Sequence, residues 1–411
     1  DGMQDSLFHR LIGRPARATL ITILLVVNII VAVATLISAY GGTVNPAHTV
    51  IPALLSMMLP IFLIAGIATA GLDLLVRKPL MAIIIALSWI ASAPSLLSYS
   101  PMHPFSSSLS PEEEGRSFRL LTWNALHFWD FRGNVPGLTS NASIGYILDT
   151  DADIVNLQEV EAIQESPMWH ITPEQVKSLK ERYPYRVVNV NNELTVLSKY
   201  PVEYVDIDMP YPMGIRMALF RFDIKGDTIN MFNVHLESIG LNMADKELYQ
   251  GLFDKAPGSE RAIRKELSDV KHQLVSKIAT ASKKRTEQAR FIRRTIDSIG
   301  GNFIVAGDFN DIQGSYAVRT ILGKGDMRDA YAENAFGPAI TYHGNRFYFR
   351  IDHVLYRGDM EARKIKRGDI PSSDHYPLTT TFLLNSNKDR YPDSETARSQ
   401  DGTTDHHKNQ P

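Results

Sequence analysis

The chain has 411 residues, of which 44% are hydrophobic and 21% charged, and it contains no cysteine. The absence of cysteine excludes disulfide scaffolds, thiolate zinc sites, iron–sulfur clusters and cysteine nucleophiles. A formal net charge of −2 argues against a protein that coats nucleic acid through its overall charge. These averages hide an uneven distribution, because residues 1–98 hold only five Lys or Arg and three Asp or Glu.

Three long apolar runs lie in this first part of the chain, at 18–40, 51–76 and 79–97. Each approaches or exceeds the roughly 20 residues that a helix needs to cross the hydrocarbon core of a bilayer. The rest of the chain has too few residues to cover three such helices as a soluble core. The sequence therefore predicts a membrane anchor over residues 1–98 with three transmembrane helices.

Basic residues around these runs indicate the orientation of the anchor. Arg10, Arg14 and Arg17 precede the first run, and Arg77 and Lys78 lie in the turn between the second and third runs. Because positively charged loops stay in the cytoplasm, we expect a cytoplasmic N-terminus. Three crossings then place everything after the anchor on the non-cytoplasmic side, which is periplasmic or extracellular.

The remainder of the chain divides into three segments. Residues 99–115 are rich in Ser and Pro and predict a linker, and the polar residues 385–411 predict a disordered tail. Residues 116–384 suit one sizeable α/β domain. Short apolar runs between turn signals predict buried strands at 118–123, 154–157, 194–197, 217–222, 229–234, 303–306, 354–356 and 378–384. Helices are predicted at 144–149, 173–182 and 259–298, the last as one or two helices.

Polar side chains stand at the ends of these strands, where α/β enzymes place their chemistry. They are Asn124, Glu159, His235, Asp308, Asn310, Asp352, Asp374 and His375. Carboxylate and amide oxygens without thiolates favour Mg²⁺, Mn²⁺ or Ca²⁺ over structural zinc. A metal with histidine, and no candidate serine nucleophile, favours hydrolysis by an activated water.

Six motifs carry a resemblance to a known family. They are LLTWN (120–124), DIVNLQEVE (153–161), NVHLES (233–238), GDFND (307–311), RIDHV (350–354) and SDHYPL (373–378). In this order they resemble the motifs of the endonuclease/exonuclease/phosphatase superfamily, the DNase I-like metal-dependent phosphoesterases. The resemblance implies a four-layer α/β sandwich, in which two packed mixed β-sheets are flanked by helices, here preceded by three transmembrane helices. It also implies a metal-dependent hydrolase that acts on phosphoester bonds.

Three of the motif residues match the metal site of that family. Glu159 matches the principal metal ligand, Asn124 the amide beside it, and Asp374 a residue near the metal. The expected cofactor is Mg²⁺, with Mn²⁺ or Ca²⁺ as alternatives, because Mg²⁺ is typically held by one or two carboxylates plus waters and substrate oxygens. His235 matches a second active-site histidine, expected to contact the substrate, which some members use as a general acid.

The other motif residues match catalytic and substrate-binding positions. Asp308 and Asn310 match the pair that orients the attacking water and contacts the scissile phosphate. His375 matches the histidine that stabilises or protonates the phosphate oxygens, and Asp352 matches its paired carboxylate, which would raise the imidazole pKa. Glu193 stands where some secreted nucleases pair a glutamate with the second histidine, and its role stays open.

The motifs indicate the bond type better than the substrate. Inositol-phosphatase relatives carry tryptophan- and cysteine-containing motifs that this chain lacks, and abasic-site nucleases are typically intracellular. Two readings stay open: a nuclease acting on external nucleic acid, and a sphingomyelinase-like or phospholipid headgroup phosphodiesterase, which a membrane anchor slightly favours. An inactive membrane-anchored binding scaffold is a third, against which the complete motif set argues. The basic stretch 261–294 is either a surface for phosphates or the solvated face of a packed helix, and no obligate protein partner is evident.

Overall fold

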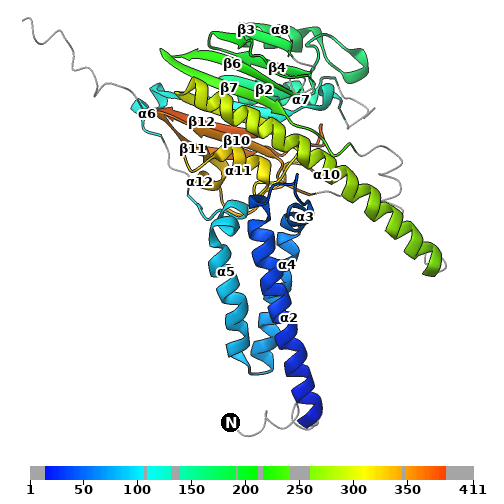
Figure 1. Ribbon diagram of the computed structural model, residues 1–411. Coiled ribbons are helices and arrows are strands. Elements are labelled where there is room, and N and C mark those ends of the chain that lie inside the picture. Colours follow the sequence, from blue (N-terminus) through cyan, green and yellow to red (C-terminus); the bar gives the residue numbers. More distant parts are fainter. Residues whose placement is uncertain are drawn as a thin grey trace, which may run out of the picture.

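The computed structural model describes residues 14–105, 109–130, 139–190, 193–211, 216–240, 260–344 and 348–385. Figure 1 shows a column of helices, coloured blue to cyan, with a layered α/β part at one end of it. The tail expected at 385–411 lies outside the described residues, apart from Asn385.

Three helices run side by side in the column, α2 (Arg14–Tyr40), α4 (Leu59–Leu75) and α5 (Pro79–Tyr99). Two helical stretches, Ala18–Thr43 and Pro79–Tyr99, are long and apolar enough to cross a membrane. The second expected span is not one straight helix, because α3 (Ile51–Met57) meets α4 at a bend of 63°. Pro60 explains this break, since its ring has no N–H to continue the ladder from α3 and clashes with the preceding turn. Among the described residues, two helices are therefore long and apolar enough to cross a membrane, or three spans are possible if α3 and α4 count as one broken span.

The surface of the column is apolar and its interior holds buried polar groups. Ile64 and Leu80, for example, are 68% and 78% exposed, which is typical of a surface that faces lipid. Between the helices, Asn28 of α2 donates a hydrogen bond of 2.7 Å to the carboxylate of Asp73 of α4, and both residues are fully buried. This bond ties two helices together across the apolar interior.

The α/β part contains two six-stranded sheets that pack face to face. The first has the order β11-β12-β1-β2-β4-β3, with β1 (Ser117–Asn124), β2 (Ile154–Gln158), β3 (Tyr185–Val190), β4 (Leu194–Ser198), β11 (Met360–Arg367) and β12 (Leu378–Leu384). The second has the order β5-β6-β7-β8-β10-β9, with β5 (Val202–Val205), β6 (Met217–Ile224), β7 (Asp227–His235), β8 (Asn302–Asp308), β9 (Arg328–Asp329) and β10 (Asp352–Arg357). Both sheets are mixed, because the pairs β1–β2 and β7–β8 are parallel and their neighbours antiparallel.

Helices cover the outer face of each sheet. The first sheet is covered by α7 (Ala142–Thr150) and α8 (Pro173–Arg182), and the second by α10 (Glu260–Ile299) and α11 (Tyr316–Leu322). Alternate residues of a strand face opposite sides, so Leu120 of β1 joins the core between the sheets while Leu121 joins the core under α7 and α8. The expected sandwich of two mixed sheets flanked by helices is thereby confirmed.

The α/β part is fixed on the end of the column. Arg319 of α11 donates to the carbonyl of Ala39 (3.1 Å) and to the hydroxyl of Ser95 (3.0 Å), which belong to α2 and α5. A Cβ on Gly42 would lie 1.8 Å from the carbonyl oxygen of Gly314, so the two backbones meet where only glycine fits. The loop that follows α2 therefore packs directly on the α/β part.

Segment 99–115, expected as a linker, also contacts the α/β part. The backbone N–H of His103 donates to the carbonyl of Ala335, at the end of α12 (Ala330–Asn334), over 3.0 Å. Further on, α6 (Pro111–Gly115) begins with a capping box between Ser110 and Glu113. The chain thus approaches β1 along a defined path on either side of the undescribed residues 106–108.

Candidate active site

Strand register brings three of the expected residues into one row across the second sheet. His235, the last residue of β7, lies opposite Asp308, the last residue of β8. Asp308 in turn lies opposite Asp352, the first residue of β10. Asn124 ends β1 and Glu159 directly follows β2 in the first sheet, so both sheets contribute polar groups to the same edge.

Two unusual backbone conformations shape this edge. Gly307 has a φ of 141°, and a Cβ there would lie 2.1 Å from the carbonyl oxygen of Val234. Only glycine therefore lets β8 pass so close to β7 just before Asp308. Glu159 has a φ of 56°, a left-handed conformation that costs about 1–3 kcal/mol for a residue with a side chain and that clusters at functional sites.

Asn124, Glu159 and Asp308 meet at the centre of the site. The amide nitrogen of Asn124 lies 2.9 Å from a Glu159 carboxylate oxygen and 3.2 Å from an Asp308 carboxylate oxygen. His235 Nε2 lies 3.7 Å from each of the same two carboxylates. Two carboxylates in so small a volume offer oxygen ligands that fit Mg²⁺, and a cation would balance their charge. The side-chain oxygen of Asn124 accepts a hydrogen bond of 3.3 Å from the backbone N–H of Leu126.

His375 forms the positively charged side of the site. Its Nδ1 lies 2.9 Å from Asp352 Oδ2, and its Nε2 lies 3.6 Å from Asp308 Oδ2. Burial alone would lower the pKa of His375, but Asp352 and Asp308 outweigh it and raise this pKa to about 10. The ring is therefore a protonated imidazolium at neutral pH. Although Asp308, Asp352 and His375 offer atoms within 4.8 Å of one another, a protonated histidine is a counter-ion and not a metal ligand.

The second histidine and the central carboxylate have pKa values shifted by burial. Burial lowers the pKa of His235 despite the neighbouring Asp308, so this ring is neutral at pH 7 and better suited to hydrogen bonding than to proton donation. Burial raises the pKa of Asp308, against the opposing effect of His375. A carboxylate of raised pKa is a stronger base toward a bound water. Two histidines in different protonation states thus face one carboxylate.

The remaining expected residues complete one pocket of about 300 Å³. Asn310, with a φ of 50°, donates its backbone N–H to Asp308 Oδ1 (2.7 Å) and its side-chain amide to the carbonyl of Leu236 (3.0 Å). These bonds hold Asp308 in place. Asp374 lines the same pocket with a partly exposed side chain. Asn124 and Asp352 stand directly behind the pocket wall and are hydrogen-bonded to wall residues. All eight residues singled out from the sequence are thus brought together.

Comparison with known proteins now identifies the family. The sequence matches the endonuclease/exonuclease/phosphatase family over residues 121–375, which is more than half of the chain. This chain belongs to the endonuclease/exonuclease/phosphatase family. The matched span begins inside β1 and ends at His375, so it contains all eight residues of the site. Residues 21–99 match a separate family described as a domain of unknown function.

Several solved structures resemble this family member. Truncated TDP2 from Caenorhabditis elegans is 17% identical with a TM-score of 0.41, covering 66% of this chain and 99% of that chain. An endonuclease/exonuclease/phosphatase from Beutenbergia cavernae is 18% identical with a TM-score of 0.43, covering 66% and 72%. Beta toxin from Staphylococcus aureus, solved with bound magnesium ions, is 12% identical with a TM-score of 0.38, covering 64% and 99%. No curated protein matches the sequence, and none of these likenesses assigns a substrate to this chain.

Sequence reasoning missed a layer of buried amides beneath the site of this family member. Gln158 donates to the side-chain oxygen of Asn233 (2.7 Å), and Asn233 donates to the carbonyl of Leu157 (2.9 Å). Asn156 donates to the carbonyl of Ala306 (3.1 Å). These bonds join the two sheets directly behind the catalytic edge. The available signal was the alternation of polar Asn156 and Gln158 with apolar residues in β2.

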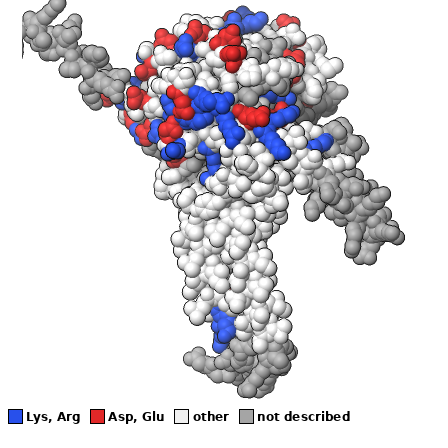
Figure 2. Space-filling view, in the orientation of Figure 1, with Lys and Arg blue, Asp and Glu red and all other residues white. Residues whose placement is uncertain are grey.

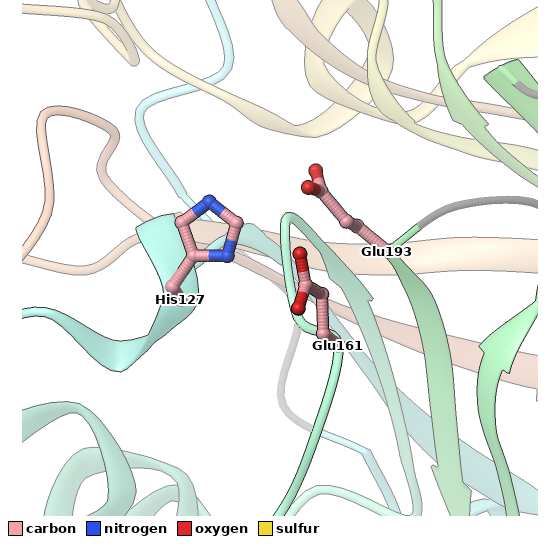
Figure 3. Close-up of side chains that lie close together, drawn as sticks. All are labelled: His127, Glu161 and Glu193. Atoms are coloured by element: carbon pink, nitrogen blue, oxygen red, sulfur yellow. The ribbon is translucent and has the colours of Figure 1, made fainter.

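A second group of potential metal ligands lies near the site and was also missed, apart from Glu193. His127, Glu161 and Glu193 converge from three separate segments, with ligand atoms within 4.8 Å of one another (Figure 3). Burial raises the pKa of Glu193, while His127 acts to lower it. Glu193 thus lies with His127 and Glu161. His235, the histidine with which the resemblance would pair it, instead lies beside Glu159 and Asp308.

The basic stretch 261–294 lies on α10, a single helix of 40 residues. Ala289, Ile292 and Ile296 are buried against the second sheet, so one face of the helix packs as the sequence suggested. Figure 2 shows Lys and Arg side chains gathered over α10, and Lys283 is among its exposed residues. The side chains of 260–272 lie outside the described part. The helix thus combines a packed face with a basic exposed face.

Proposed function

We propose that this chain is a divalent-metal-dependent phosphoester hydrolase of the phosphodiesterase or nuclease type, tethered to a membrane with its catalytic domain outside the cytoplasm. One observation carries the proposal. Donors for a hard cation and the protonated imidazole of His375 line the same pocket, on either side of Asp308, whose carboxylate lies 3.6 Å from His375 Nε2. A phosphoester bound in this pocket beside Asp308 would meet positive charge from the cation and from His375, which is the main requirement of phosphoryl chemistry.

The proposed mechanism is direct in-line attack of water without a covalent intermediate. Glu159 and Asn124, with Asp374 beside them, would hold Mg²⁺, or alternatively Mn²⁺ or Ca²⁺, which supplies charge neutralisation to the phosphate. Asp308 positions the attacking water and takes its proton. His375 stabilises the charge that grows on the phosphate oxygens, and Asp352 keeps the ring charged.

Asn310 and His235 complete the proposed contacts to the phosphate. Both line the pocket beside Asp308, His235 with a buried ring and Asn310 with a partly exposed side chain held by its hydrogen bonds to Leu236 and Asp308. Donors preorganised in this way are worth about 3–4 kcal/mol each in a transition state. We therefore expect each contact to affect kcat more than KM.

The proposed topology has three spans, with α3 and α4 forming one broken span. The turn after α4 carries Arg77 and Lys78, and Figure 2 shows basic residues at the end of the column away from the catalytic part. The positive-inside rule then places that end in the cytoplasm and the catalytic domain outside. A reporter active only outside the cytoplasm, fused after Leu384, tests this orientation, and activity of a cytoplasmic reporter there would refute it.

Activity is tested on the purified full-length protein in detergent. It is offered plasmid DNA, RNA, sphingomyelin, phosphatidylcholine and a small chromogenic phosphodiester, with Mg²⁺ or with EDTA. We expect metal-dependent hydrolysis that is lost in Glu159→Ala and His375→Ala. Wild-type turnover by either variant would contradict the assigned roles. Absence of hydrolysis by the wild-type protein with every metal would favour the alternative of an inactive membrane-anchored scaffold.

A further inference from the structure

A second cavity lies between the helical column and the catalytic part. Its volume is about 480 Å³, and it contacts the start of α4 on one side and the loops before β10 on the other. Leu59 and Pro60 line its wall on the column side, and Gln313, His343 and Arg350 line it on the catalytic side. We call it the junction cavity.

The junction cavity adjoins the catalytic pocket. Met57, Ile312 and Phe349 line both, so their side chains stand at the boundary between the two spaces. Two further anchor residues, Pro46 and Ala53, line the catalytic pocket itself. The membrane anchor is therefore part of the wall of the active site, and its contribution to that wall is apolar.

The wall of the junction cavity includes polar side chains whose hydrogen bonds are incomplete. Among the described residues, Gln313 Oε1, His343 Nε2 and Arg350 Nε are buried and have no hydrogen-bond partner. Gln313 and Arg350 are only 7% and 3% exposed. Leaving such groups unpaired costs about 1–3 kcal/mol each, and a ligand with its own polar atoms would offset this cost if a side-chain rotation turned them toward the cavity.

The chemistry of the wall changes along this path. The catalytic pocket supplies charged groups for a phosphate, and the catalytic side of the junction cavity supplies the polar side chains of Gln313 and His343. The column supplies the apolar Leu59 and Pro60 together with the hydroxyl-bearing residues Ser38, Ser56 and Ser95. A membrane lipid has the same succession of groups: a phosphoester, a polar ester or amide linkage, and hydrocarbon chains. A nucleic acid has no apolar third part, and it extends on both sides of the phosphate that is cut.

We infer that the junction cavity binds the linkage and hydrocarbon part of a lipid phosphoester, whose phosphate lies at His375 and Asp308 and which enters from the bilayer beside α3 and α4. This inference rests on the proposed function and names its substrate class. The bend between α3 and α4 explains how Met57 reaches this site, because it turns α3 toward the catalytic pocket.

The test compares a lipid with a small diester in the full-length protein. Met57→Trp fills the boundary between the two spaces, and Met58→Trp is the matched control, because Met58 lines neither space and is 39% exposed. The substrates are sphingomyelin and phosphatidylcholine in mixed micelles, and bis(p-nitrophenyl) phosphate in solution. We expect the ratio of lipid to small-diester kcat/KM to fall at least tenfold in Met57→Trp and to stay within about twofold in Met58→Trp.

A chain-length series on the unmodified protein gives an independent readout if Met57→Trp fails to fold. The kcat/KM for phosphatidylcholines should rise at least tenfold from two-carbon to eight-carbon acyl chains, below their micelle concentrations. Equal kcat/KM along the series, an unchanged ratio in Met57→Trp, or faster cleavage of DNA or RNA than of any lipid would overturn the inference. Hydrolysis of the small diester in those cases would leave the proposed function standing, whereas its absence would refute that function as well.

Discussion

The pair formed by Asp352 and His375 allows a sharp prediction about pH. Asp352→Asn preserves the shape of the side chain and removes its charge at a distance of 2.9 Å from Nδ1 of His375. His375 is only 4% exposed, so water cannot replace the lost charge. Burial will then act against the protonated ring, with Asp308 as the main remaining carboxylate in contact.

The magnitude follows from the pKa of His375. The difference between an ordinary value of 6.5 and about 10 is equivalent to about 5 kcal/mol in favour of the charged ring, and Asp352 contributes the largest share. Without Asp352 the pKa should fall, because burial is then opposed mainly by Asp308. A return to the ordinary value of 6.5 would leave about 3% of the rings protonated at pH 8, which sets the scale of the expected drop in kcat/KM at about 30-fold. Much of this loss should be recovered at pH 5.5, where the ring is protonated again.

The assay is a profile of kcat/KM against pH, from 5.5 to 9.5, for the small chromogenic diester with saturating Mg²⁺. The wild-type protein should keep the imidazolium over this range, whereas Asp352→Asn should lose activity above about pH 6.5. Asp369→Asn is the control, because the Asp369 side chain is 84% exposed. An Asp352→Asn profile with the same shape as the wild type, only lower, would refute the charge-based reasoning and leave Asp352 a structural role.

Three further predictions concern the metal, the core and the anchor. Glu159→Gln should raise the Mg²⁺ concentration for half-maximal rate at least about tenfold, and an unchanged metal dependence would contradict its role as a ligand. Burial lowers the pKa of His353 to about 4 in the folded chain. As the pH falls below 6.5, the His353 ring therefore binds a proton in the unfolded chain, whereas in the folded chain it stays neutral down to about pH 4. The free energy of unfolding should therefore fall by about 3 kcal/mol between these pH values, and less in His353→Gln, as measured by chemical denaturation. Asn28→Leu leaves Asp73 buried without its donor and should destabilise the column by about 1 kcal/mol; a melting temperature equal to that of wild type would argue against a role for this bond.

Most of the catalytic part was predictable because its signals are local. The run from Pro173 to Arg182 predicts the helix that forms, since Thr172 and Gln175 supply a capping box at its start. Strands with apolar residues on both faces, such as β1 and β8, were visible as short continuous runs. β11 was not predicted, because Met360–Arg367 alternates charged and apolar residues at the edge of its sheet and has no run of apolar letters.

The site residues were predictable as a set, and the resemblance also predicted the raised pKa of His375 through its pairing with Asp352. The lowered pKa of His235 was not predicted, because the resemblance names this residue only as a second histidine that some members use as a general acid. The difference arises from register and burial, because Asp352 bonds His375 at 2.9 Å while His235 stays at 3.7 Å from its nearest carboxylates. Contacts between strands far apart in the chain therefore decide which histidine carries the proton.

The relation between anchor and active site was the least predictable feature, and it changes the meaning of the anchor. Hydropathy predicts that three apolar runs cross a bilayer, but it does not predict which parts of the α/β domain the ends of these helices contact. Pro60 interrupts the second run, α3 bends by 63°, and Met57 thereby reaches the wall of the catalytic pocket. A tether that served only to hold the enzyme near the membrane would need a linker and no such contact. Because Arg319 also fixes the column to α11 by two hydrogen bonds, removing the column would expose the side of the candidate active site that Pro46, Ala53 and Met57 line.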